Sequence, residues 1–167
     1  KNTSQKNNEL AQLVEKFTVG NDKQSDILLA KHDVLGSLAH TKMLAEVGLL
    51  STEELIPIQQ ELKNIYKEIE SGNFSIADES EDIHSEIEFR LTKKLDDTGK
   101  KIHSGRSRND QVLLDVKLYT REKLEQIVLQ TKTVFDSFIQ LSNLHKNKLL
   151  PGYTHLQLAM PSSFGLW

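Results

Sequence analysis

Apolar residues return every three or four positions through most of this chain, which is the spacing of amphipathic helices. The pattern predicts a short helix that ends at Gly20 and a longer one from residue 26 to a terminating Gly48. A third helix follows the capping-box pair Ser51 and Glu54 and ends at 71–73. It either kinks at Pro57 or begins its regular part nearer to that residue. A fourth is expected at about 80–96, with Gly99 ending it. The apolar positions of the short first helix, which ends at Gly20, are Leu10, Leu13, Val14 and Phe17.

The longest periodic segment follows Gly105. The 45 residues between Gly105 and Pro151 contain neither glycine nor proline, so one continuous helix of roughly 60 Å is expected. A stripe of this length needs a helical partner outside one small domain, and we therefore expect an oligomer. Residues 151–161 predict a turn and a mostly apolar loop, and Ser162 and Ser163 fit the cap of another helix. No segment alternates as a strand does, which indicates an all-α protein.

Composition narrows the classes of function. The chain has 167 residues, 37% hydrophobic and 27% charged, with a net charge of −3 and no cysteine. A near-neutral charge disfavours general attraction to nucleic acid or membranes. The missing cysteines exclude disulfides and thiolate chemistry and fit a cytoplasmic location. No apolar stretch reaches the roughly 20 residues that cross a bilayer. Any binding must therefore come from local groups of side chains.

Donor groups crowd the predicted start of the long helix, in the sequence KKIHSGRSRND at 100–110. Gly105 permits close backbone approach, Arg106 and Arg108 offer forked donors, and a helix start adds unpaired N–H groups. These features predict a receptor for carboxylate or phosphate, although a solvated basic loop would look similar. Asp110 would repel an anion unless it orients an arginine or begins the helix. No nucleotide-binding P-loop sequence is present.

Two of the six histidines have suggestive neighbours. His155 follows Thr154 in the segment between two prolines, and rigidly placed loops often carry chemistry. His84 follows Glu81 and Asp82 at a helix start, for which an ordinary acidic N-terminus is the simpler interpretation. His84 and Glu88 are too few ligands to argue for a metal, and neither a metal nor a cofactor is expected.

Four segments together resemble the argininosuccinate lyase family of the fumarase and aspartase superfamily. They are DVLGSLAHTKML at 33–44, EDIHSEIEFRL at 81–91, HSGRSRNDQV at 103–112 and LLPGYTHLQLAMP at 149–161. The resemblance covers nearly all of residues 17–167. It implies an all-α homotetramer built on long central helices, with residues 1–107 as a small N-terminal helical domain and 108–167 as the start of the central bundle.

The resemblance also implies a reaction, the reversible elimination of fumarate from argininosuccinate to leave arginine, by a cytoplasmic carbon–nitrogen lyase. His155 corresponds to the proton-transfer histidine of the family, the one catalytic residue expected here. The positions that correspond to substrate-binding residues are Asn109, Thr154, Arg108, Ser107, His84, Asp82, Asp33 and Ser37. Preorganised donors would stabilise the carbanion, whose charge spreads into a succinyl carboxylate.

Departures from the family pattern leave alternatives open. The second catalytic group of the family, a serine in a mobile loop, has no counterpart in this sequence, so we expect the chain by itself to be inactive. The region around Gly20 differs where an early substrate-contacting serine is common. A non-catalytic, crystallin-like structural protein and a lyase acting on another succinyl or aspartyl compound remain alternatives. A nucleic-acid-binding module is the least supported, because the basic residues lack interleaved aromatics.

Overall fold

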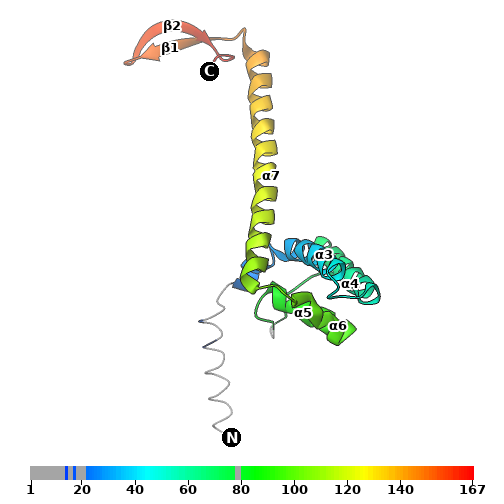
Figure 1. The fold of residues 1–167 in the computed structure, drawn as a ribbon. Coiled ribbons are helices and arrows are strands. Elements are labelled where there is room, and N and C mark those ends of the chain that lie inside the picture. Colours follow the sequence, from blue (N-terminus) through cyan, green and yellow to red (C-terminus); the bar gives the residue numbers. More distant parts are fainter. Residues whose placement is uncertain (1–13, 15–16, 18–21, 78–79) are drawn as a thin grey trace. The chain divides into compact units, whose positions relative to one another are not determined.

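The structure of the chain is a computed structural model that describes residue 14, residue 17, and residues 22–77 and 80–167. The predicted stripe at Leu10 and Leu13 and its end at Gly20 lie outside these residues. Contacts divide the chain into two compact units, Lys1–Thr120 and Arg121–Trp167, which are described separately. The predicted domain boundary between 107 and 108 stays a prediction. The helices (Figure 1) are α2 (Asp22–Asp26), α3 (Ala30–Glu46), α4 (Thr52–Glu70), α5 (Ile83–Leu95), α6 (Asp97–Lys100), the 3-10 helix η1 (Lys101–His103) and α7 (Arg108–His145).

The core of the first unit lies between α3, α4 and α5. Apolar side chains on their facing stripes are almost completely removed from solvent, and each such burial contributes about 1.5–3 kcal/mol relative to an exposed position. The predicted periodicity therefore identifies the core faces of α4 and α5 correctly. The buried apolar residues of this core are Ala30, Val34, Leu44, Leu50, Ile58, Leu62, Ile65, Phe74, Ile83, Ile87, Leu91 and Ile102.

Two predicted helix boundaries are confirmed by their local chemistry. Ser51 caps α4 by accepting a hydrogen bond from the Glu54 N–H at 3.2 Å, and the Glu54 carboxylate accepts one from the Ser51 N–H at 3.0 Å. Gly48 follows α3 with a φ of +79°, a conformation that glycine adopts without strain. The helix α4 runs from Thr52 through Pro57, so the alternative in which its regular part begins nearer to Pro57 is wrong.

Two boundaries were predicted wrongly. The helix expected from residue 26 begins at Ala30, because a separate short helix and a turn precede it. Gly99 does not end the fourth predicted helix, which stops at Leu95 before Asp96 with a φ of +51°. Gly99 lies inside α6, where a Cβ atom would come within 2.5 Å of the Leu91 carbonyl. The glycine is needed for this close approach between α6 and α5, which the local pattern cannot reveal.

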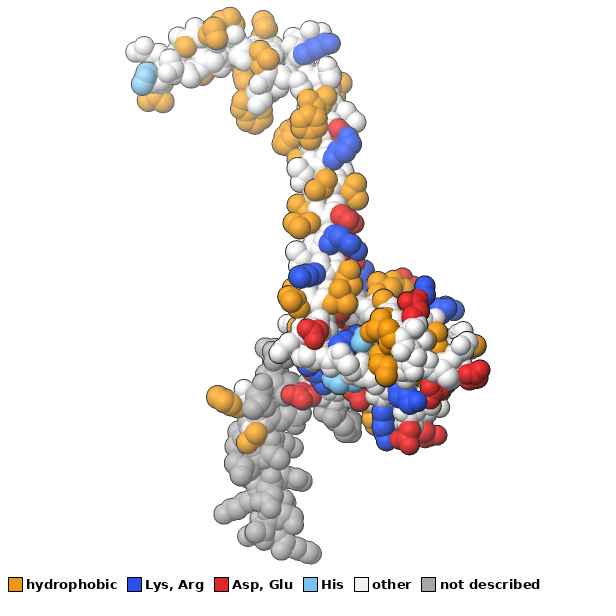
Figure 2. Space-filling model, viewed as in Figure 1, with side chains coloured by type: hydrophobic (Ala, Val, Ile, Leu, Met, Phe, Trp, Pro, Cys, Tyr) orange, Lys and Arg blue, Asp and Glu red, His pale blue; other side chains and the backbone are white. Residues whose placement is uncertain are grey.

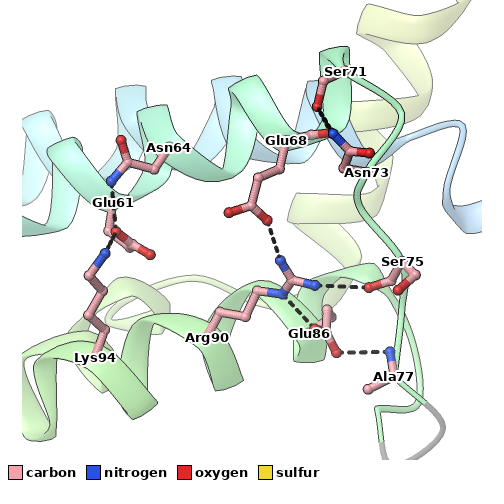
Figure 3. A network of polar contacts seen from close by, with 10 residues as sticks. All are labelled: Glu61, Asn64, Glu68, Ser71, Asn73, Ser75, Ala77, Glu86, Arg90 and Lys94. Carbon is pink, nitrogen blue, oxygen red and sulfur yellow. Dashed lines mark hydrogen bonds and ion pairs between the residues drawn. The ribbon is translucent and has the colours of Figure 1, made fainter.

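A polar network fastens α5 to α4 and to the segment between them (Figure 3). The buried Glu86 carboxylate accepts hydrogen bonds from the Arg90 Nε at 2.6 Å and the Ala77 N–H at 3.1 Å. Arg90 in turn pairs with Glu68 at 2.7 Å and donates to the Ser75 carbonyl. Burial opposes ionisation of Glu86, but hydrogen bonds from Ser80, Arg90 and Ala77 outweigh it, so the pKa of Glu86 is lowered.

We expect Glu86→Ala to destabilise the protein by about 3 kcal/mol, because it removes the acceptor of the buried Ser80 hydroxyl and of the partly buried Ala77 N–H and Arg90 Nε. The matched control is Glu88→Ala on the same helix, for which we expect a loss of under about 1 kcal/mol. The measurement is the urea midpoint at one fixed protein concentration. Equal midpoints for the two variants would show that the network contributes nothing.

The second unit contains the remainder of α7 and a β-hairpin. The strands β1 (Leu149–Thr154) and β2 (Gln157–Ser163) pair antiparallel, with Thr154 opposite Gln157 and Leu149 opposite Ser163. The predicted loop at 151–161 and the predicted helix cap at Ser162 are therefore wrong. Pro151 and Gly152 discourage a strand locally, yet an irregularity in the pairing between Pro151 and Tyr153 accommodates them. The chain remains predominantly helical, as expected.

Helix α7 runs without a break for 38 residues, about 57 Å at 1.5 Å per residue, which is close to the predicted length. Figure 2 shows hydrophobic side chains along it. The hydrophobic side chains of α7 in the second unit that are more than half exposed include Leu124, Ile127, Phe135, Phe138 and Leu144. An apolar surface of this kind on a single helix is typical of an interface. Within the part of the chain that the structure describes, no helix is long and apolar enough to cross a membrane.

Candidate active site

A buried polar cluster lies where α3, α5 and the start of α7 meet in the first unit. Asp33 on α3 is fully buried, and its Oδ1 lies 2.9 Å from Nδ1 of His84 on α5. Gln111 on α7 donates its side-chain N–H to the same Oδ1 at 2.5 Å. Asp115, one turn further along α7, places its Oδ2 3.7 Å from the His84 Nδ1. Three helices therefore bring two predicted substrate-binding residues, Asp33 and His84, into one group.

The two carboxyl groups of this cluster share a low-dielectric site. Burial and the charge and hydrogen bonding of Asp33 raise the pKa of Asp115 to about 8, and Arg106 opposes the shift. Asp115 is therefore mostly protonated at neutral pH, as expected when two buried carboxyls lie together. In this state Asp115 adds no negative charge to the cluster.

Ligand atoms of Asp33, His84 and Asp115 all lie within 4.8 Å of one another, a spacing that can also hold a metal ion. The other groups present favour a proton over a cation. Gln111 directs an N–H donor at the Asp33 oxygen, and the guanidinium of Arg106 supplies positive charge nearby. A bound cation would have to compete with both. We therefore interpret the cluster as a proton-sharing pair of carboxyls that orients a histidine.

Arg106 and Ser37 form a second contact between α3 and the segment before α7. The Arg106 Nη2 donates to the Ser37 Oγ at 3.1 Å, and Ser37 is fully buried. Burial lowers the pKa of Arg106, while Asp33, Asp115 and Asp110 act in the opposite direction. Arg106 therefore points into the protein, where it balances the acidic cluster, and does not serve as one of the predicted open donors.

Asp82 and Arg108 pair across the start of two helices. Asp82 caps α5 by accepting a hydrogen bond from the Ser85 N–H at 2.8 Å, and its other oxygen forms an ion pair with Arg108 Nη1. Burial raises the pKa of Asp82, but hydrogen bonds from Ser85 and the charge of Arg108 outweigh this effect, and the net shift is downward. Asp82 is therefore a helix cap, in agreement with the simpler interpretation of this stretch as an ordinary acidic N-terminus. It also orients a predicted substrate-binding arginine.

The start of α7 is capped by its own side chains. The Ser107 Oγ accepts from the Asn109 N–H at 3.2 Å, and the Asp110 carboxylate accepts from the Ser107 N–H at 3.2 Å. This reciprocal arrangement explains why an acidic residue stands among so many donors, since Asp110 lies in the first turn of α7 and accepts from the Ser107 N–H that precedes it. We expected unpaired backbone N–H groups here, but those of Ser107 and Asn109 both have acceptors. The exposed side chain of Asn109 is available to a ligand.

The remaining predicted residues, Thr154 and His155, lie in the second unit at the hairpin turn. His155 and Leu156 form its two-residue connection, with φ values of +49° and +62°. This is the backbone of a type I′ turn, which Asn and Gly adopt more readily than His and Leu. Non-glycine residues in this region carry strain of order 1 kcal/mol, and such strain clusters at functional sites. Both Thr154 and His155 are exposed.

Sequence reasoning missed Gln111, Asp115 and the inward role of Arg106. Val112 and Val116 lie on the apolar face for which we expect a helical partner from outside the domain, and both are more than a third exposed, while Gln111 and Asp115 are buried. A signal was available, because Gln111 and Asp115 stand four residues apart and share one face of the helix. The spacing alone does not show that this polar face is the buried one.

Comparison with known proteins identifies a family for the chain. Residues 5–167 match the family described as lyase. The chain is 55% identical over 163 residues to the argininosuccinate lyase of Phocaeicola vulgatus, covering 98% of this chain and 36% of that protein. It is 57% identical over 154 residues to that of Bacteroides thetaiotaomicron, covering 92% and 34%. The chain thus spans about a third of the length of these curated relatives.

A solved structure supports the fold. The β-carboxy-cis,cis-muconate cycloisomerase of Acinetobacter calcoaceticus sp. ADP1 matches with a TM-score of 0.62 at 19% identity, over 92% of this chain and 37% of that one. At this identity the likeness concerns the fold alone. Since the family match extends over residues 5–167, nearly the entire sequence, the chain belongs to the lyase family.

Proposed function

We propose that the chain is part of an argininosuccinate lyase, which eliminates fumarate from argininosuccinate reversibly and leaves arginine. The observation that carries this proposal is the 55% identity, over nearly the whole chain, to relatives named argininosuccinate lyase. The retained segments around Asn109 and His155 support it, because they hold the residue types that the reaction needs. The term full-length protein denotes this chain extended to the length of its relatives.

The proposed chemistry assigns a role to each group of residues. A proton leaves the carbon next to a succinyl carboxylate, the carbanion charge spreads into that carboxylate, and the carbon–nitrogen bond then breaks. Ser107, Arg108, Asn109 and Thr154 bind the substrate and stabilise the developing charge by fixed hydrogen bonds. His155 transfers a proton. The surrounding positions are Asp33, Ser37, Asp82 and His84.

We further propose a cytoplasmic homotetramer without a cofactor. The exposed apolar side chains of α7 support an assembly through this helix. In such an assembly, the residues at the start of α7 in one chain and the hairpin of another can serve one substrate. Native mass spectrometry of the full-length protein should give four copies, and a monomer at micromolar concentration would contradict the assembly.

Release of fumarate, followed by its ultraviolet absorbance, tests the activity. The full-length protein is incubated separately with argininosuccinate, adenylosuccinate and aspartate. Turnover of argininosuccinate at a kcat/KM at least 100-fold above the other two is the expected outcome, roughly 2.7 kcal/mol of discrimination. Preference for another compound would indicate a different lyase of the superfamily. A folded tetramer that releases no fumarate would indicate a structural protein.

A further inference from the structure

We propose that Asp115 and Gln111 are positioning residues, which hold Asp33 so that it fixes the orientation and the tautomer of the His84 ring. The catalytic consequence rests on the proposed function, in which His84 contacts the substrate. The arrangement itself rests only on the buried cluster between α3, α5 and α7. Neither Gln111 nor Asp115 is among the site residues that the sequence predicted.

The geometry defines which nitrogen of His84 carries a proton. Asp33 Oδ1 lies 2.9 Å from His84 Nδ1, and a carboxylate oxygen can only accept a hydrogen bond. Nδ1 must therefore carry the hydrogen, which leaves Nε2 of a neutral ring as an acceptor. The choice of tautomer thus depends on the placement of the Asp33 carboxylate. Nε2 could then accept a hydrogen bond from a ligand N–H, such as one of a guanidinium.

Asp33 is held from two sides. Gln111 donates to the same Oδ1 at 2.5 Å, across a sequence separation of 78 residues. The other oxygen, Oδ2, is buried and accepts no hydrogen bond from the residues that the structure describes, and the same is true of both oxygens of Asp115. A proton on Asp115 supplies the missing partner, because its O–H can donate to Asp33. The raised pKa of Asp115 agrees with this assignment.

Three charged or titratable groups of the described residues act on Asp115 and fit this arrangement. Asp33 approaches from α3, His84 from α5 and Arg106 from the segment before α7. A second negative charge on Asp115 would compete with Asp33 for the His84 N–H, since its Oδ2 lies only 3.7 Å from Nδ1. Protonation removes this competition, and Asp33 alone then orients the ring. In metal sites, mutating a residue that orients a ligating histidine typically costs 10- to 100-fold in affinity or activity, and we expect an effect of this order here.

The experiment compares Asp115→Asn with Asp115→Leu in the full-length protein. An asparagine amide is neutral and can donate to Asp33, as a protonated carboxyl does, whereas leucine cannot. Asp97→Asn is the matched control, because it neutralises a carboxyl on α6 that is 92% exposed. The tautomer of His84 is followed by solid-state NMR of protein labelled with ¹⁵N-histidine, and the His84→Gln variant assigns the signal.

We expect Asp115→Asn and the control to keep the Nδ1–H signal and to retain kcat/KM within about threefold. Asp115→Leu and Gln111→Leu should give mixed tautomers of His84 and lower kcat/KM at least tenfold. Loss of the Nδ1–H signal in Asp115→Asn, or its persistence in a folded Asp115→Leu, would overturn the proposal. The NMR result does not require turnover. A wild-type protein with the Nδ1–H signal but no fumarate release would contradict only the proposed activity.

Discussion

Replacing His155 by alanine in the full-length protein is expected to lower kcat/KM for argininosuccinate about 1,000-fold. General acid–base catalysis by a positioned side chain contributes roughly 10²- to 10⁴-fold, and the alanine side chain cannot transfer a proton. The expected loss is equivalent to about 4 kcal/mol of transition-state stabilisation. The initial rate of fumarate release measures it directly. Since the imidazole is exposed at a hairpin turn, its removal should leave the folded state nearly unchanged.

Leu156→Ala provides the control for this experiment. Leu156 is the other residue of the same two-residue turn, it is 99% exposed, and its φ of +62° resembles that of His155. Both substitutions therefore truncate an exposed side chain while imposing the same backbone demand on alanine. Similar activity losses in the two variants would mean that turn geometry, and not proton transfer, explains the effect. A loss of less than fivefold in His155→Ala would remove His155 from the mechanism.

The second large effect is expected at the start of α7, where Asn109→Leu should lower kcat/KM at least ~100-fold, about 2.7 kcal/mol at 1.36 kcal/mol per tenfold. Leucine has a similar size but lacks the amide that would bind a substrate carboxylate. The helix cap should persist, because Asn109 contributes its backbone N–H to that cap, donating to Ser107 Oγ. Substrate binding should weaken because a contact is lost. The value of kcat should also fall, because we expect this contact to strengthen as charge develops in the transition state.

Asn143→Leu repeats this substitution at another exposed asparagine of α7, one that donates its side chain to the Ile139 carbonyl. We expect activity to stay within threefold of the wild type. Thermal unfolding of both variants shows whether the helix is retained. Unchanged kinetics for Asn109→Leu, with argininosuccinate below its KM, would refute the proposed contact between Asn109 and the substrate.

Local patterns in the sequence determined most of the helical framework. Apolar periodicity identified α4, α5 and α7, and the capping pair at Ser51 and Glu54 located the start of α4. These features depend on groups within about four residues of one another, so a short window of sequence contains the relevant interactions. Four motif segments likewise indicated the lyase family by their residues alone, and the family match confirms it.

The tertiary structure alone decided which polar groups meet. Asp33 and His84 are 51 residues apart in sequence, and Asp33 and Gln111 are 78 apart. Their contact depends on how three helices pack, and so does the burial that raises the pKa of Asp115. The same holds for Gly99, whose role is a close approach to Leu91, and for Arg106, which faces inward toward Ser37. Sequence periodicity marks a face of a helix, but only packing determines whether that face meets solvent or another helix, because burial is a property of the assembled chain.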